Sequence, residues 1–333
     1  MSEKAILSEK AELDLLYRNI DAADLQPLWI ETQGYVPRQP SPHITPAHWP
    51  AEKLFGLLRQ AGKSISSEFA DRRVLVCKNP TLPPFGGTTQ TLYACVQLLL
   101  PGERASEHRH SQSAFRFVLS GEGAHTLLNG EPVSMKRGDF IITPYWTWHG
   151  HANESQNEVI WLDGLDNGIV RMFDATFFEL PFTEASGPGV PPPAVTAEYS
   201  QWLYSFGDML ALLHTMRQGM PDSAHGYRIR YLDRKTGRDP LPTMSAFLSH
   251  LPKGFVGQPY RSSDSAVFVA ARGAGRTEIG DRTITWKEND IFTVPTWVTF
   301  RHIVEADDAI LFSFSDRNAQ ERLECWREER NAR

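Results

Sequence analysis

Short apolar runs alternate with glycine- and proline-containing turns along most of the chain, which is typical of antiparallel β-structure. Between residues 72 and 165 the runs include RRVLVC, TLYACVQLLL, SAFRFVLSG, GDFIITPYW and NEVIWLDGL. A second region of the same kind extends from about residue 227 to residue 315. Strands of this length and spacing predict a sandwich or a barrel in each region.

Helices are predicted before and between these regions. Residues 8–20 are rich in Glu, Lys, Leu and Ala. A second helix is framed by Thr45 as its N-cap, Pro46 as its first residue and Gly62 beyond its end. A third helix is predicted after Thr196. The apolar residues on one face of this third helix, at a spacing of 3.6, are Tyr199, Trp202, Leu203, Phe206, Met209, Leu210 and Leu213.

The second β region repeats the first. SAFRFVLSGEGAHTLLNGE aligns with SAVFVAARGAGRTEIGDRT, which places Gly121 and Gly273 152 positions apart. RGDFIITPYWTW aligns with ENDIFTVPTWVT, which places Asp139 and Asp290 151 positions apart. A nearly constant offset across several markers indicates two related β domains.

We therefore expect four parts in this mainly β chain of 333 residues. They are an N-terminal helical segment (1–70), a first β domain (71–182), a linker with the amphipathic helix (183–226), and a second β domain with a charged, helical tail (227–333). The linker is expected at TEASGPGVPPPAVT, because this composition is typical of segments without regular structure.

Charge and cysteine content exclude several classes of protein. The chain has 40 acidic and 34 basic residues, a net charge of −6, which disfavours nucleic acid as a partner because binding it needs a concentrated basic surface. No apolar run approaches the roughly 18 residues that a membrane helix needs, and the charged start does not resemble a signal peptide. Three widely spaced cysteines without a CxxC motif predict a reducing, cytoplasmic location and no disulfide framework.

Four histidines stand in two His-x-His pairs of the first β domain. Because strand side chains alternate between faces, His108 and His110 point to one side of their strand, and His149 and His151 share a face of theirs. Pairing of these strands would bring a third imidazole to the first two, where they could share a metal ion. An isolated His-x-His pair is also compatible with a purely structural role.

The order Gly-x5-His-x-His, GEG, GD and Pro-x4-His resembles the cupin β-barrel, and the repeat then implies a bicupin with two tandem barrels. Ala114 and Phe115, which cannot ligate, stand where a cupin often carries a carboxylate ligand. Three neutral histidines leave positions on a metal open for an anionic substrate and O2. By themselves they do not choose between iron, zinc, manganese, nickel and copper.

The second repeat lacks these ligands. The positions that match His108, His110 and His149 hold Tyr260, Ser262 and Phe300. We therefore predict a degenerate second barrel without a metal site, which serves as a scaffold. His302, which matches His151, is interpreted as structural.

Longer segments resemble the gentisate 1,2-dioxygenase family of ring-cleaving bicupins, which includes salicylate and 1-hydroxy-2-naphthoate dioxygenases. They are LYACVQLLLPGERASEHRHSQSAFRFVLSGEGAHTLLNGE, GDFIITPYWTWHGHANES, IWLDGLD and YRIRYLDRKTGRDPLPTM. The resemblance implies one Fe(II) per subunit at His108, His110 and His149 and O2-dependent opening of gentisate (2,5-dihydroxybenzoate) to maleylpyruvate. It also implies a homotetramer.

The resemblance further implies a pocket for a small aromatic ortho-hydroxy acid. The substrate-binding residues that it implies are Arg72, Tyr93, Gln97, Arg116 and His151, and the catalytic residues are Gln97, Arg116, His151 and Asp163. An arginine can hold a carboxylate through two parallel hydrogen bonds. Histidine and glutamine can hydrogen-bond to ring oxygens or to dioxygen.

Each pocket residue also has a structural interpretation. Arg72 precedes Arg73, and such pairs are usually solvated. A buried Arg116 needs an anion, which Asp163 can supply without any substrate. Gln97 can satisfy backbone groups inside its strand.

Two other functions remain open. The same scaffold could open salicylate, a substituted salicylate or 1-hydroxy-2-naphthoate. The family tends to carry tyrosine at Tyr93 in gentisate enzymes, which favours gentisate, while Cys95 either narrows the pocket or fills the core. The second alternative is a non-catalytic or zinc-bearing bicupin that binds a small aromatic acid.

Overall fold

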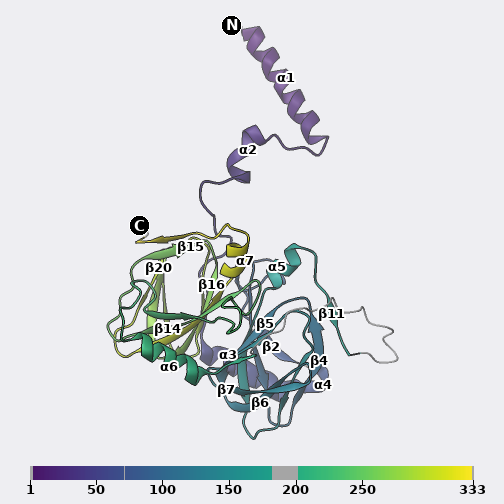
Figure 1. Ribbon diagram of the computed structural model, residues 1–333. Coiled ribbons are helices and arrows are strands. Elements are labelled where there is room, and N and C mark those ends of the chain that lie inside the picture. Colours follow the sequence, from purple (N-terminus) through teal and green to yellow (C-terminus); the bar gives the residue numbers. More distant parts are fainter. Residues whose placement is uncertain (1–2, 71, 182–201, 332–333) are drawn as a thin grey trace. The chain divides into compact units, whose positions relative to one another are not determined.

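The computed structural model describes residues 3–70, 72–181 and 202–331 (Figure 1). The chain forms two compact units, Met1–Ser41 and Pro42–Arg333. Among the described residues, no helix has both the length and the apolar character needed to span a membrane.

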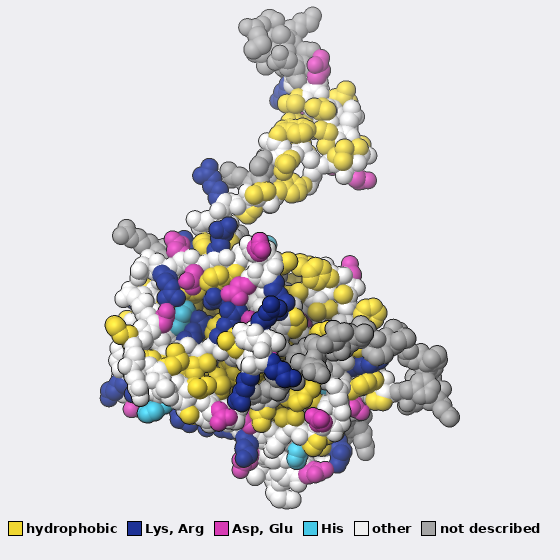
Figure 2. Space-filling view, viewed as in Figure 1, with side chains coloured by type: hydrophobic (Ala, Val, Ile, Leu, Met, Phe, Trp, Pro, Cys, Tyr) yellow, Lys and Arg dark blue, Asp and Glu magenta, His cyan; other side chains and the backbone are white. Residues whose placement is uncertain are grey.

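The first unit contains two helices, α1 (Glu3–Asp21) and α2 (Leu28–Tyr35). Helix α1 confirms the helix expected over residues 8–20, where Glu, Lys, Leu and Ala favour helical backbone. Hydrophobic side chains of this unit are exposed on the face that Figure 2 shows. The exposed side chains of the unit include those of Leu16 and Trp29.

The second unit consists of two similar halves, each built from a six-stranded and a five-stranded sheet. The sheet orders in the first half are β12-β8-β5-β10-β3-β2 and β11-β4-β9-β6-β7. Its strands are β2 (Arg73–Val76), β3 (Tyr93–Leu99), β4 (Arg104–His110), β5 (Ala114–Ser120), β6 (Glu122–Leu128), β7 (Glu131–Lys136), β8 (Phe140–Thr143), β9 (His149–Asn153), β10 (Val159–Leu165), β11 (Phe178–Glu179) and β12 (Leu203–Tyr204).

The second half repeats this arrangement, with sheet orders β1-β19-β16-β21-β14-β13 and β18-β17-β20-β15-β22. Its strands are β1 (His48–Trp49), β13 (Tyr227–Arg230), β14 (Ser245–Leu251), β15 (Tyr260–Ser262), β16 (Ala266–Arg272), β17 (Gly275–Ile279), β18 (Arg282–Trp286), β19 (Ile291–Val294), β20 (Phe300–Ile303), β21 (Ala309–Ser315) and β22 (Glu328–Arg330). The two halves confirm the predicted mainly β bicupin fold.

Short helices accompany the sheets (Figure 1). They are α3 (Ala51–Ser64), α4 (Ser67–Ala70), α5 (Asn167–Met172), α6 (Phe206–Met216) and α7 (Arg317–Arg322). The charged tail is helical only in α7 and then continues into β22, so the helical prediction for the tail holds in part.

Helix α3 begins later than the prediction that placed its start at Thr45 and Pro46. Strand β1 comes first and pairs with β19 of the second half. The backbone N–H of Ala51 then donates to Asp290 Oδ1 at 2.8 Å, which gives a partner to one of the N–H groups that the first turn of a helix leaves unpaired. Gly62 lies inside the helix and not beyond its end. Local signals missed this boundary because Asp290 is 239 positions away in the sequence.

Helix α6 begins at Phe206, and not soon after Thr196 as predicted. Strand β12 precedes it and pairs with β8 of the first half. The backbone N–H of Phe206 donates to Asp139 Oδ1 at 3.0 Å. The predicted linker at 183–196 lies outside the described residues. Asp139 and Asp290 therefore have the same structural role in the two halves, because each accepts a hydrogen bond from the first turn of a helix that leads into the other half.

Phenylalanine rings from both halves form the core at their junction. Phe117 and Phe312 stack with their ring centroids 4.1 Å apart, and Phe115 meets Phe314 edge-on at 4.8 Å. All four rings are fully or almost fully buried. Burial of this much aromatic surface holds the two barrels against each other.

Two buried aspartates lie at the same junction. Asp316 Oδ1 accepts from the backbone N–H of Ser265 at 2.9 Å, and its Oδ2 accepts from the hydroxyl of Thr91, in the first half, at 2.8 Å. Asp166 makes the equivalent bonds in the first half, with a hydroxyl from the second. Burial raises the pKa of Asp316 to about 7 and that of Asp166 to about 6.

Candidate metal and substrate site

Three histidines converge inside the first barrel. Strands β4 and β9 pair antiparallel, with His108 directly opposite His149, and His110 follows two positions later on the same strand. The imidazole centroids of His108 and His149 are 4.1 Å apart, and those of His110 and His149 are 4.9 Å apart. One ring nitrogen from each of the three lies within 4.8 Å of the others, which is close enough for a shared metal ion.

Backbone carbonyl groups orient these rings. His110 Nδ1 lies 2.9 Å from the carbonyl oxygen of Gln112, and His149 Nδ1 lies 2.9 Å from that of Thr147. A ring nitrogen at this distance donates its proton to the carbonyl, so the proton sits on Nδ1 and Nε2 keeps its lone pair. His108 Nδ1 differs, because it lies 3.3 Å from the carbonyl oxygen of Ser106 but only 2.8 Å from Arg72 Nη2, which is a donor.

Burial keeps the three imidazoles neutral. It lowers the pKa of His108 to about 3 and that of His110 to about 4, and it also lowers the pKa of His149 well below its usual value. Positive charge on Arg72 and Arg116 acts in the same direction. Neutral imidazoles are the form that ligates a metal, so the donor set fits a divalent cation.

A cavity of about 150 Å³ opens onto the three histidines. It is also lined by five of the other residues implied by the resemblance, namely Arg72, Gln97, Arg116, His151 and Asp163. Tyr93 does not line it, and its hydroxyl donates to the backbone carbonyl of Phe85.

Cys95, for which the sequence left a place in the pocket or in the core open, lines the cavity. Val74 and Leu165, which the sequence analysis did not single out, contribute apolar surface. Leu165 follows Asp163 by two positions on β10, and Val74 on β2 follows Arg72, which lies just before that strand, by two positions. The period of two could therefore have identified them.

Arg116 and Asp163 form a buried ion pair within this cavity. Arg116 Nε lies 3.5 Å from Asp163 Oδ1, and Arg116 Nη1 donates to the hydroxyl of Thr143. Trp161 Nε1 donates to Asp163 Oδ2 at 3.0 Å. Burial lowers the pKa of Arg116 to about 10 and raises that of Asp163 to about 6. Arg116 therefore stays charged at pH 7, and its buried Nε makes no hydrogen bond within the described structure.

Gln97 and His151 present further polar atoms to the cavity. The amide nitrogen of Gln97 is buried, and it has no hydrogen-bond partner among the described residues. His151 Nδ1 lies 3.1 Å from the hydroxyl of Thr126, and its ring packs against Trp161. Burial lowers the pKa of His151 well below its usual value, so this imidazole is neutral as well.

The two adjacent arginines separate in the structure. Arg73 is buried, with an ion pair to Glu103 and a 3.0 Å bond to the carbonyl of Ile65. Arg72 Nη2 instead reaches the cavity, 2.8 Å from His108 Nδ1, and also donates to the carbonyl of Ser106. The two arginines therefore do not form the solvated surface pair that was the structural interpretation of this sequence.

The second barrel repeats the geometry without the ligands. Tyr260 pairs directly with Phe300, as His108 does with His149. The register thus confirms the predicted equivalence of these positions. Among the described residues, the only group of three or more candidate metal ligands is the one in the first barrel.

Comparison with known proteins places the chain in a family. A family model for the cupin domain matches residues 95–164. The chain is 38% identical to "Gentisate 1,2 dioxygenase 1" of Aquipseudomonas alcaligenes, over 98% of each protein. The chain belongs to the gentisate 1,2-dioxygenase family. Another family member, "5-aminosalicylate 1,2-dioxygenase" of Comamonas sp, is 29% identical over 97% of this chain and 91% of its own.

A solved structure within this family has the same fold. The salicylate 1,2-dioxygenase of Pseudoaminobacter salicylatoxidans, solved as an adduct with gentisate, superposes with a TM-score of 0.84. The match has 31% sequence identity and covers 97% of this chain and 94% of the other. It therefore includes both barrels.

Proposed function

We propose that this protein is an Fe(II)- and O2-dependent dioxygenase that opens gentisate between its carboxyl-bearing and adjacent hydroxyl-bearing carbons to give maleylpyruvate. One observation carries the proposal: three neutral histidines face a cavity that also holds a charged, incompletely bonded Arg116. Such a cavity suits a small anion that also reaches a metal. The names of the family members narrow that anion to an aromatic hydroxy acid.

The metal proposed for the three histidines is iron, one per subunit. Their imidazoles suit Fe(II) as well as other divalent ions, and the choice of iron rests on the family resemblance. A bound Fe(II) would supply open coordination positions for substrate oxygens and for O2, together with the redox chemistry of ring opening.

Arg116 is proposed to hold the substrate carboxylate. Its Nε makes no hydrogen bond among the described residues and lies 3.5 Å from Asp163 Oδ1, so the guanidinium charge is only partly compensated, and a substrate carboxylate in the cavity would pair with it. Asp163 and Thr143 hold the guanidinium in place, and Trp161 in turn holds Asp163.

Arg72 is proposed to turn toward the same carboxylate. When His108 ligates through Nε2, its Nδ1 carries the proton and donates to Ser106, so Nδ1 no longer accepts from Arg72. The guanidinium can then turn from this nitrogen toward the substrate anion.

Gln97 and His151 are proposed to position the ring oxygens and dioxygen. The unpartnered amide of Gln97 can donate to a hydroxyl or phenolate oxygen. The neutral His151, fixed by Thr126, can accept or return a proton at its other ring nitrogen. Val74, Cys95 and Leu165 add apolar surface beside them.

The assembly and location are also proposed. The family resemblance supports a homotetramer. Three free cysteines, of which Cys77 and Cys95 are buried or half-buried, support a reducing, cytoplasmic setting.

The test is anaerobic reconstitution with Fe(II), followed by O2 consumption with gentisate and identification of the product by mass spectrometry. Uptake of one O2 per gentisate, with both oxygen atoms in the product, is the expected result. Uptake with only salicylate, 5-aminosalicylate or 1-hydroxy-2-naphthoate would support the proposed ring-opening reaction and refute gentisate as the substrate. Bound metal without uptake on any of these acids would favour the binding protein.

A further inference from the structure

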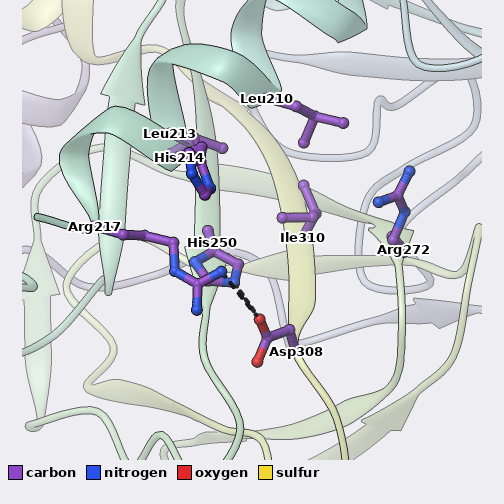
Figure 3. Close-up of a pocket in the computed structure, with 8 residues that line it drawn as sticks. All are labelled: Leu210, Leu213, His214, Arg217, His250, Arg272, Asp308 and Ile310. Carbon is purple, nitrogen blue, oxygen red and sulfur yellow. Dashed lines mark hydrogen bonds and ion pairs between the residues drawn. The ribbon is translucent and has the colours of Figure 1, made fainter.

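A second cavity, of about 190 Å³, lies between helix α6 and the ends of β14, β16 and β21. Its lining is shown in Figure 3 and consists of Leu210, Leu213, His214, Arg217, His250, Arg272, Asp308 and Ile310. None of these residues lines the cavity at the three histidines. We call it the α6 groove.

The α6 groove has an apolar middle and two polar ends. Leu210 and Ile310 lie between the ends in Figure 3, with Arg272 on one side and the Arg217, Asp308 and His250 group on the other. A ligand that fits must therefore be apolar in its middle and polar at both ends. Because drug-sized molecules occupy pockets of roughly 300–1,000 Å³, this smaller groove suits a single ring.

One end is built around a buried histidine. His250 is 5% exposed, and its Nε2 lies 2.9 Å from Asp308 Oδ2. Its Nδ1 is buried and has no hydrogen-bond partner within the described structure. Asp308 also accepts from the backbone N–H of Lys253 at 2.8 Å and lies 3.6 Å from Arg217. The carboxylate is therefore well compensated, while the histidine retains an unused polar atom.

The other end is a cation without a carboxylate partner. Arg272 makes no ion pair with any carboxylate of the described residues, and its guanidinium lies over the ring of Phe206 at 5.8 Å from the centroid. Two arginines against one aspartate leave the α6 groove with an excess positive charge, although the whole chain has a net charge of −6. The unpaired charge lies at the end away from Asp308 (Figure 3).

We propose that the α6 groove binds a small aromatic acid whose carboxylate and hydroxyl lie at opposite ends of the ring. The carboxylate pairs with Arg272, the ring lies on Leu210 and Ile310, and the hydroxyl donates to the unpartnered Nδ1 of His250, whose Nε2–H donates to Asp308. This site goes beyond the proposed function, because it is separate from the metal cavity and does no chemistry. It gives the protein a second, non-catalytic site for an aromatic acid.

The test uses 4-hydroxybenzoate, titrated calorimetrically into the Fe(II)-loaded protein without O2. This acid has no hydroxyl beside its carboxylate, so it cannot chelate a metal through both groups. Binding should weaken at least about tenfold in Arg272→Gln, because a charged hydrogen bond is lost, and should persist in Arg116→Ala. 4-Hydroxybenzyl alcohol, which lacks the carboxylate, should not bind.

Arg234→Gln is the matched control, since Arg234 is exposed and does not line the α6 groove. It should bind 4-hydroxybenzoate as the unaltered protein does. Unchanged affinity in Arg272→Gln, or loss of all binding in Arg116→Ala, would overturn the site. A change of oligomeric state in Arg272→Gln, measured by sedimentation, would refute the ligand site and indicate that the α6 groove contacts a second copy of the chain. None of these readouts needs turnover, so they stand apart from the test of the proposed function.

Discussion

Replacement of Arg116 by glutamine separates its two roles, as anchor for a substrate carboxylate and as counter-charge for Asp163. The substitution removes a buried charge whose Nε makes no hydrogen bond in the described structure. Hydrogen bonds to charged groups contribute about 1.5–3 kcal/mol each. At about 1.36 kcal/mol per tenfold, the loss of one such bond lowers kcat/KM by about 10- to 160-fold.

The partner of Arg116 responds in a defined direction. Burial already raises the pKa of Asp163 to about 6, and Arg116 acts to lower it. Without Arg116 that pKa rises further, which favours the uncharged carboxyl. Any Asp163 that stays ionised would repel the substrate, and this alternative cause of a loss of binding in Arg116→Gln is what the next experiment tests.

The decisive assay is a double-mutant cycle of Arg116→Gln and Asp163→Asn, read as kcat and KM for gentisate in Fe(II)-loaded protein. If Arg116 anchors the substrate, KM stays high in the double variant. Recovery of the original KM in that variant would refute the anchoring role and leave Arg116 as a counter-charge. Iron content per chain, measured in every variant, shows that the metal site is intact.

Three other substitutions test different parts of the molecule. His108→Ala should abolish both metal retention and turnover, measured by elemental analysis and O2 uptake; full activity would remove this ligand from the site. Phe312→Ala should cost about 3–5 kcal/mol in unfolding by denaturant, because it opens a cavity between the barrels, and a loss below about 1 kcal/mol would argue against a tightly packed junction. Asp316 has its pKa raised from 3.8 to about 7, so its contribution to stability is present below about pH 4 and is lost as pH rises through 7. The Tm of Asp316→Asn relative to the unaltered protein should therefore improve between pH 4 and pH 8, and parallel Tm curves would contradict this.

The sequence predicted the parts of this fold that depend on local periodicity. Alternation of side chains along a strand was enough to place His108 and His110 on one face, and the repeat offset was enough to predict two equivalent barrels. The starts of α3 and α6 were predicted wrongly, because strand pairing and caps from Asp290 and Asp139 fix them, and these lie 239 and 67 positions away. The residues around each helix start do not reveal a hydrogen-bond partner that is so distant in the sequence.

The α6 groove was not predictable for the same reason. Its polar groups come from the C-terminal end of α6, from β14, from the end of β16 and from the turn before β21, and each looks like an ordinary surface residue in the sequence. Only the packed structure shows that His250 is buried with a free Nδ1 and that Arg272 lacks a carboxylate partner among the described residues.

Comparison of the two barrels separates groups needed for folding from those needed for chemistry. The bond between Thr126 and His151 recurs as that between Thr277 and His302, at 3.1 and 2.9 Å, so it belongs to the barrel framework and is not by itself a sign of catalysis.

Unlike this Thr–His bond, the three histidine ligands and the ion pair of Arg116 and Asp163 do not recur. The second barrel has other residues at all of these positions. The residues at the positions of Arg116, Asp163 and Gln97 are Phe268, Ser313 and Ser249, as the matching strand registers show. A buried arginine and aspartate are costly to keep, and a phenylalanine replaces the arginine where no metal ligands remain. The pair of Arg116 and Asp163 thus accompanies the histidines, although the second barrel places a different arginine, Arg228, with a buried Nε in its own cavity.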